Sequence, residues 1–525
     1  MSDSLRTYQT RISSSSDEVL SAYAQLMASV EHRLYSDIQA GQPAAALKSP
    51  YLTQFQITAR QFNSLRVRIE GKMDSVRKQI LRRLEEKKGQ IEAIEQTLQR
   101  LKNKTIVHQK KRRLKQLVAQ KMRLEAQLNK GAVPLCFGGR KLFRKQFALE
   151  ENGYSTHDEW KAEWQQARAS EIFLLGSKDE TGGNQSCTAS FNEDGSLTLR
   201  LRLPDALVPQ FGKYYLIPNV CFSYGGAHIA ASLRHCMLRQ ELFRAKNPSY
   251  RLYGKAITWR FKKDAKGWRI FATTDIELPK PITSHQKGVV AVDINSDHLA
   301  VVELDRFGNP VHRFTLPLSL YRLTTDQTRA QIGDAASVLI AYCARQQKPL
   351  VVEDLDFQKK KSQLREFSAS HARMLSAFAY KSILTHLKAR GELVGVEVQS
   401  VNPAYTSLIG RVKFADRYGL SIHHAAALSI GRRYLGVSER MPQGQREIPD
   451  GKGGHLTLDL PVRNRTRHVW TQWGQLKRKL QAALPAHFQA VKYRSSGSRK
   501  AILVTEILDF VGAIPIRESS ALLLS

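Results

Sequence analysis

The stretch Lys287–Asp305, which reads KGVVAVDINSDHLAVVELD, decides the fold of the second half of this chain. A short apolar run over 289–292 ends on the carboxylate of Asp293, a polar turn with Asn295 and Asp297 follows, and a second apolar run completes the stretch. Two such runs around a polar turn predict a β-hairpin. A carboxylate where a buried strand reaches water suits metal binding, because a charge inside the sheet would be costly.

The segments after this hairpin alternate between strand and helix patterns. We predict strands over 289–295, 298–305, 310–316, 349–355 and 393–401, and helices over 325–346, 368–390 and 420–435. Three antiparallel strands followed by α-β-α-β-α is the order of an RNase H-like fold, in which the first strand and the strand after the first helix are neighbours. Asp293 and Glu353, which end these two strands, should therefore meet.

Two converging carboxylates can hold divalent cations that activate water and stabilise the leaving oxygen of a phosphodiester. Oxygen ligands favour Mg²⁺ or Mn²⁺. Asp354 and Asp356 are alternatives to Glu353 as the second carboxylate, but the two-residue period of a strand puts the Asp354 side chain on the other face. A third ligand is expected on the late helix, where GLSIHHAAALSIGRR over 419–433 offers no carboxylate.

The composition indicates a polyanionic partner. The 525 residues suffice for about two to four domains, and 81 Lys and Arg against 47 Asp and Glu give a formal net charge of +34. Such a charge favours nucleic acid or an anionic membrane surface and predicts strong salt dependence. The nearest approach to a membrane span, AILVTEILDFVGAIPI over 501–516, is interrupted by two acids, and the N-terminus lacks the apolar core of a signal peptide. Nucleic acid is therefore the favoured partner, with no membrane.

The five cysteines are scattered and form no C-x-x-C motif. This excludes an ordinary zinc ribbon or finger and gives no disulfide framework. Structural or free thiols in a reducing cytosol fit the pattern better.

Residues 1–130 are predicted to be largely helical. A strand over 5–12 precedes a helix from Asp17 to about Asp37, and a basic helical hairpin follows from about 61 to 130, with its turn at 102–105. No acidic residue occurs between Arg100 and Arg123. The basic block within this interval consists of Lys110, Lys111, Arg112 and Arg113. A solvated helix face is the usual explanation of a charge run, but so one-sided a run repels itself, so we favour phosphate contact.

Residues 131–285 contain short β-like runs separated by turn signals, which predict an all-β unit built as a small barrel. Basic and aromatic residues interleave over 140–147, where they would either grip a nucleic-acid backbone or form a solvated loop. In the tail, 444–454 is predicted to be a loop. Arg465 and Arg467 belong to a later basic cluster expected to contact phosphate, and Trp470 and Trp473 would either stack on bases or pack a helix.

Several segments resemble one protein family. They are VAVDIN (290–295), VVEDL (351–355), NPAYTS (402–407), FGGRKLF (137–143) and LLGSKDETGGNQSC (174–187). The first three resemble the RuvC-like nuclease domain of transposon-encoded TnpB proteins, relatives of the type V CRISPR effectors. The last two resemble the branch called TnpB-related accessory proteins. The likeness spans nearly the whole chain. It implies wedge and recognition modules before a RuvC-like domain, together with a guide RNA from the same locus and a double-stranded DNA target.

Two departures from the family bear on activity. After Ser407 the chain runs LIGRVKFADRYG without cysteine, so no zinc is expected. In the family the late helix starts with the motif D-x-N-A-A-x-N-I, whose Asp is the third acid. Aligning Ile430 with the Ile of this motif puts His423 at the position of that Asp. A histidine can ligate a metal through a ring nitrogen, so the resemblance implies a catalytic, metal-binding set of Asp293, Glu353 and His423. A capping or packing role for His423 stays open, as does replacement of the acid by Asp416 or Asp297.

The sequence thus predicts an α+β multidomain protein with an N-terminal helical insertion and a wedge-like β-barrel before an RNase H-like domain. The expected divisions are 1–60, 61–130, 131–285, 286–440 and 441–525. The first functional hypothesis is an RNA-guided DNA endonuclease in the bacterial cytoplasm, close to the nucleoid. The alternatives are an RNA-guided DNA-binding protein with little or no cleavage, acting as a repressor, and a DDE-type transposase.

Overall fold

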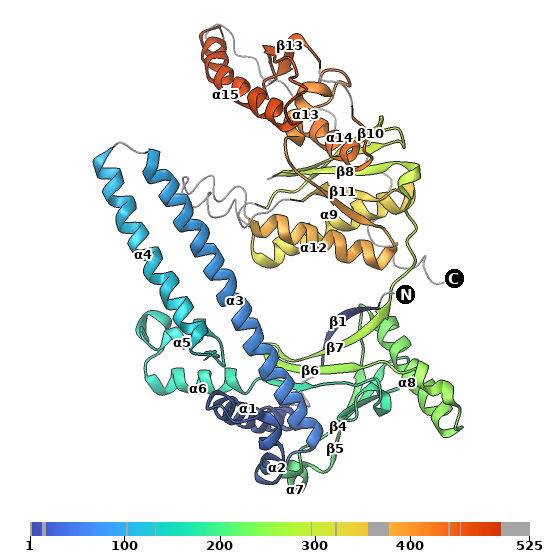
Figure 1. Cartoon of the computed structure of the whole chain (residues 1–525). Coiled ribbons are helices and arrows are strands. Elements are labelled where there is room, and N and C mark those ends of the chain that lie inside the picture. Colours follow the sequence, from blue (N-terminus) through green and yellow to red (C-terminus); the bar gives the residue numbers. More distant parts are fainter. Residues whose placement is uncertain are drawn as a thin grey trace. The chain divides into compact units, whose positions relative to one another are not determined.

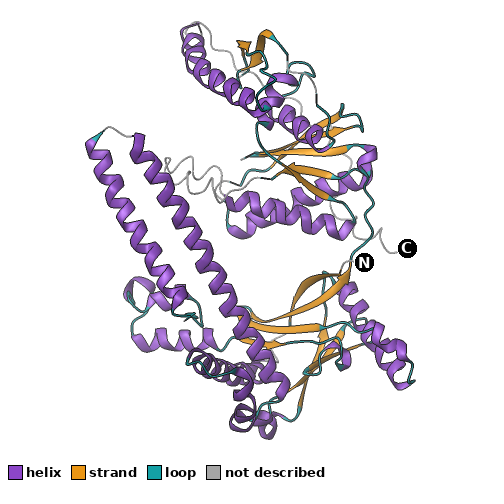
Figure 2. Ribbon diagram, in the orientation of Figure 1, coloured by secondary structure: helices purple, strands orange, loops and turns teal. Residues whose placement is uncertain are grey.

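The computed structural model describes residues 3–12, 17–100, 103–131, 133–295, 297–320, 323–354, 377–438, 442–451 and 453–494. The chain is a mixed α/β protein that divides after Lys280 into two compact units, labelled by element in Figure 1. Helices and strands occur in both units (Figure 2).

The first unit contains four long helices near its N-terminus. They are α1 (Asp17–Gln39), α2 (Ala44–Phe55), α3 (Ala59–Arg100) and α4 (Lys104–Asn129). One face of α1, which includes Leu20, Tyr23 and Met27, is buried. Helices α3 and α4 pack together as the predicted hairpin (Figure 1). Asn103 starts α4, because its side chain accepts hydrogen bonds from the amides of Thr105 and Ile106.

Two open sheets form the β-structure of the first unit. One has the order β1-β7-β6-β2 and the other β3-β4-β5. Their strands are β1 (Asp3–Arg11), β2 (Glu171–Leu174), β3 (Cys187–Phe191), β4 (Leu197–Arg202), β5 (Tyr214–Val220), β6 (Ile257–Asp264) and β7 (Gly267–Glu277). The run of buried residues at every second position of β7 explains why its strand pattern is readable from the sequence.

The predicted all-β barrel over 131–285 is wrong in two respects. The strands that the structure describes make two separate sheets and not a closed barrel. The region also contains helices, namely α5 (Arg140–Lys145), α6 (His157–Arg168), α7 (Val208–Phe211) and α8 (Gly226–Arg244). The longest, α8, buries Ile229, Leu233 and Cys236, a spacing typical of one helix face.

The second unit is built on a five-stranded sheet of order β10-β9-β8-β11-β12. Its strands are β8 (Val289–Ile294), β9 (His298–Leu304), β10 (Pro310–Pro317), β11 (Leu350–Glu353) and β12 (Val398–Val401). β8, β9 and β10 are antiparallel neighbours, whereas β11 runs parallel to both β8 and β12. The antiparallel arrangement of the first three strands and the pairing of β8 with β11 agree with the prediction.

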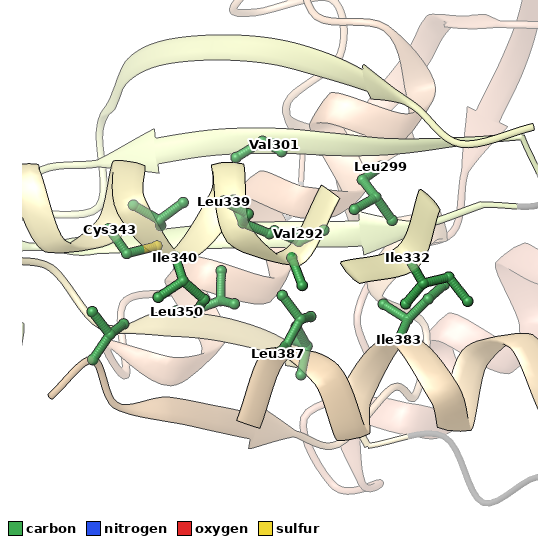
Figure 3. Packing of buried hydrophobic residues seen from close by; sticks show 14 of the residues in the cluster. Val292, Leu299, Val301, Ile332, Leu339, Ile340, Cys343, Leu350, Ile383 and Leu387 are labelled. Atoms are coloured by element: carbon green, nitrogen blue, oxygen red, sulfur yellow. The ribbon is translucent and has the colours of Figure 1, made fainter. Parts of the chain in front are cut away.

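Helices cover both faces of this sheet. They are α9 (Thr325–Gln346), α12 (Ala377–Val394), α13 (Thr406–Lys413) and α14 (Ile422–Tyr434). Val290 and Val292 of β8 share one apolar core with residues of α9 and α12; Figure 3 shows Val292 there with Leu339 and Leu387. The intervening Val289 and Ala291 belong to a second core with α14. The two faces of β8 thus alternate residue by residue.

The predicted helix 368–390 and strand 393–401 need correction. Residues 368–376 lie outside the described residues, and the helix extends to Val394. Gly395, at a φ of 82°, then ends it in the left-handed conformation that favours glycine. The strand is therefore confined to β12.

The tail forms a small module instead of the predicted loop at 444–454. Strands β13 (Gly444–Pro449) and β14 (His455–Leu460) make a hairpin, followed by helix α15 (Val469–Arg494). β14 alternates exposed and buried residues, and its apolar face packs on Trp473 and Leu476 of α15 and on Leu408 of α13. The stretch 501–516 lies outside the described residues. None of the described helices is long and apolar enough to cross a bilayer.

Candidate functional site

The two predicted carboxylates end neighbouring parallel strands on one face of the second sheet. Leu350 pairs with Val290 and Val351 with Ala291, so continuing this register to the strand ends places Glu353 beside Asp293. Asp293 follows Ala291 at the two-residue period, and therefore faces the side covered by α14. Asp293 as a residue is only 8% exposed, so it is almost buried where β8 reaches the sheet edge.

His423 lies against Asp293. Its Nδ1 atom is 3.2 Å from Asp293 Oδ2, and the amide of Asn295 donates to the same oxygen at 3.1 Å. The side chain of Ser421 caps α14 by accepting from the amide of His424, which fixes the turn that carries His423. The hydrogen bond with Asp293 raises the pKa of His423, against the opposing effect of burial. Asp293 and His423 thus form an ion pair when the imidazole is protonated.

A second histidine completes this group of polar side chains. The ring of His298 lies edge-on to that of His423, with centroids 4.9 Å apart. His298 Nδ1 is 2.8 Å from the exposed carboxylate of Asp297, and this contact lowers the pKa of Asp297. Asp297 also raises the pKa of His423 by charge attraction. Asp416, the other alternative third acid, is exposed in the turn after α13.

Glu353 is held by different partners. Its carboxylate accepts a hydrogen bond from the hydroxyl of Thr406, the first residue of α13, and its backbone carbonyl accepts from the hydroxyl of Tyr380. Thr406 is buried at 1% exposure. The neighbouring Asp354 is exposed just beyond the end of β11, and Asp356 lies outside the described residues.

The geometry therefore brings Asp293 and His423 together and puts Glu353 on the adjacent strand, anchored to α13. Within the described part of the chain, no group of three His, Cys, Asp or Glu side chains converges closely enough to hold a metal ion. The donor chemistry of the two carboxylates fits Mg²⁺ or Mn²⁺. Sequence reasoning missed Asn295, His298 and Thr406 as partners, although Asn295 and Thr406 lie inside the motifs VAVDIN and NPAYTS.

The predicted nucleic-acid contacts are mostly accessible. Lys111, Arg112 and Arg113 are exposed on α4, and Lys110 is half-buried. Arg465 and Arg467 are exposed in the loop between β14 and α15. The two tryptophans of this region differ. Trp473 is 4% exposed in the core of the C-terminal module, whereas Trp470 is 44% exposed. Packing therefore explains Trp473, whereas the exposed ring of Trp470 lies edge-on to those of His468 and Tyr405.

Neither a protein-family model nor a curated protein matches this chain. Among solved structures, Thermus thermophilus RuvC in complex with a Holliday junction substrate is 15% identical, over 29% of this chain and 97% of RuvC, at a TM-score of 0.22. A chain of a CRISPR-Cas12f ternary complex is 11% identical, over 79% of this chain and 81% of the Cas12f chain, at a TM-score of 0.26. A chain of a Cas12f1-sgRNA-target DNA complex is 11% identical, over 82% of this chain and 100% of the other chain, at a TM-score of 0.20. All three TM-scores are low, so these similarities carry no argument about the fold.

Proposed function

We propose that the chain is an RNA-guided DNA endonuclease of the TnpB type, with a RuvC-like domain in its second unit. The observation that carries this proposal is the placement of Asp293 and Glu353, which end adjacent parallel strands and face the same side of an RNase H-like sheet. Paired carboxylates at such an edge are suited to phosphodiester hydrolysis.

The side chains at the site are of the types that bind a divalent cation. Asp293 and Glu353 would supply hard oxygen donors, and His423 would supply a ring nitrogen as third ligand. When bound there, Mg²⁺ or Mn²⁺ would provide Lewis acidity and an activated water. Asn295 and Thr406 would orient the carboxylates through the hydrogen bonds described above.

The partners follow from the charge. A net charge of +34 with exposed basic residues on α4 and in the loop before α15 favours a guide RNA and a double-stranded DNA target. We assign 1–60, 61–130 and 131–285 to wedge and recognition functions, 286–440 to the nuclease domain and 441–525 to a basic C-terminal module. The bacterial cytoplasm, close to the nucleoid, is the corresponding location.

One observation favours a second function, RNA-guided DNA binding without cleavage. When protonated, His423 forms an ion pair with Asp293 and puts its positive charge where a metal cation would otherwise balance the carboxylate. A protein that retains this pair would occupy its target as a repressor and leave the DNA intact.

Sequencing of co-purified RNA and cleavage by variants test both functions. A discrete RNA from the flanking locus supports either RNA-guided function, and its absence contradicts both. With that RNA and a matched plasmid, His423→Asp should retain or raise cleavage in Mg²⁺, because it adds a hard, charged ligand. His423→Ala should abolish cleavage. Full activity in His423→Ala would remove this residue from the site and promote Asp297 or Asp416.

A further inference from the structure

The first unit contains a pocket of about 520 Å³ between α1, α3, α6, β2 and the segment 134–140. Of its lining residues, only Glu31 and Glu171 are acidic. Its basic lining residues are Arg68, Lys72, Arg83, Arg140 and Arg168. The pocket wall therefore carries an excess of positive charge.

The two carboxylates are already paired. Glu31, at 2% exposure, lies 2.7 Å from Lys72 Nζ and 3.5 Å from Arg68 Nε. Glu171 lies 2.7 Å from an Arg68 guanidinium nitrogen. The pocket arginines that pair with no carboxylate among the described residues are Arg83, Arg140 and Arg168.

Arg168 is fixed in place without being neutralised. Its guanidinium contacts both ring nitrogens of His32, at 3.3 and 2.6 Å, and lies 5.9 Å from the ring centre of Trp164. Burial, followed by the nearby cations, lowers the pKa of His32 to about 4, so the imidazole is neutral at pH 7. Burial also lowers the pKa of Arg168. A partly buried cation held only by neutral groups is stabilised when an anion enters.

We propose that this pocket binds a phosphate group of a nucleic-acid strand, with Arg168 as the preset donor and Arg83 and Arg140 at its rim. A guanidinium matches phosphate through paired, charge-assisted hydrogen bonds. A second hollow of about 510 Å³ on α3 shares Ser75 and Gln79 with the pocket, and its lining adds Lys78 and Arg82 together with the carboxylate of Asp74. The inference rests on the proposed nucleic-acid binding and assigns one fixed contact within it.

The cysteines allow this contact to be measured in the full chain after high salt has removed bound nucleic acid. Cys136 lines the pocket, Cys221 is exposed elsewhere, and the remaining three thiols are buried. We expect a saturating RNA or DNA oligonucleotide to slow alkylation of Cys136 at least about tenfold, with Cys221 unchanged. Each thiol is compared with its own unliganded rate by mass spectrometry, and a gel shift on the same samples reports binding.

A charge-matched pair of variants gives the control. Arg83→Gln with Arg140→Gln should raise the oligonucleotide concentration for half-protection about ten- to a hundredfold. Lys161→Gln with Lys266→Gln removes two exposed charges outside the pocket, on α6 and in the turn between β6 and β7, and should change the half-protection concentration less than about threefold. If both double variants raised the half-protection concentration equally, binding would depend on the overall positive charge of the protein, and the proposed phosphate contact in this pocket would be wrong.

The remaining outcomes separate this inference from the proposed function. A gel shift without protection of Cys136 overturns the pocket and leaves RNA-guided binding intact. Absence of any gel shift contradicts the proposed function itself. Protection by inorganic pyrophosphate with none by oligonucleotides overturns the nucleic-acid assignment and shows a site for a free phosphate anion.

Discussion

Lys348, just before β11, forms an ion pair and a hydrogen bond with β9, and β9 and β11 are the two strands that flank β8. Its Nζ atom lies 2.6 Å from Glu303 Oε1 and donates a 3.0 Å hydrogen bond to the carbonyl of Leu304. The Lys348 and Glu303 side chains are nearly buried, at 10% and 7% exposure, and the hydroxyl of Tyr342 also donates to Glu303. Burial alone would raise the pKa of Glu303, but the hydrogen bonds from Lys348 and Tyr342 hold it below its usual range.

Lys348→Met should therefore loosen the sheet that carries the candidate site. It leaves the Glu303 carboxylate buried without its cation, at a cost of ~3–5 kcal/mol. If this cost lowers the free energy of local opening of β8 and β9 by the same amount, their amide hydrogens should exchange about a hundred- to a few thousandfold faster. Hydrogen-exchange mass spectrometry of peptides within 289–304 measures the effect.

A double variant separates the lost charge from the lost side chain. Lys348→Met with Glu303→Gln removes both charges and keeps an acceptor for Tyr342, so exchange should stay within about tenfold of wild type. If exchange in Lys348→Met alone stays within about threefold of wild type, the ion pair between Lys348 and Glu303 contributes little to the stability of this sheet.

Three further predictions concern binding, pH and the C-terminal module. Replacing residues 110–113 by Gln should weaken nucleic-acid binding in a gel shift without lowering Tm; unchanged affinity with a lower Tm would make the run structural. The hydrogen bond with Asp293 raises the pKa of His423, so this pair stabilises the fold fully below the usual histidine pKa of about 6.5 and is lost as pH rises through the folded pKa. Since a metal needs the neutral ring, cleavage should fall with decreasing pH from above 6.5, and an unchanged pH profile in His423→Asp would contradict this role. Trp473→Ala should destabilise the C-terminal module by ~3–5 kcal/mol. Trp470→Ala should leave Tm unchanged and weaken binding of single-stranded nucleic acid by ~1–3 kcal/mol. Equal losses of Tm in the two variants would contradict a packing role for Trp473 alone.

Much of the second sheet was predictable because its apolar runs are short, regular and bounded by turns. The hairpin within Lys287–Asp305 and the helix over 325–346 lie where the sequence indicated. The β-hairpin at 444–460 was missed because its strands are short and Gly451 and Gly454 give a strong loop signal. Packing of Trp473 supplies the apolar surface on which that hairpin folds.

The sequence indicates the candidate residues Asp293, Glu353 and His423 but not how their side chains pair. The strand order alone makes Asp293 and Glu353 neighbours. The contact of His423 with Asp293 depends on how closely α14 approaches the sheet, and Gly431 permits this approach, since a Cβ there would lie 2.7 Å from a methyl carbon of Leu304. No local pattern in the sequence encodes that distance.

The most direct test of the account is cleavage of a matched plasmid by the wild-type protein with its own RNA, in Mn²⁺ and in Mg²⁺. Imidazole is a softer ligand than carboxylate and carries no negative charge, so cleavage should be stronger in Mn²⁺. Asp293→Ala and Glu353→Ala should abolish cleavage while guide-dependent DNA binding persists. Guide-dependent binding by wild type with no cleavage in either metal would contradict the nuclease proposal and establish the non-cleaving function.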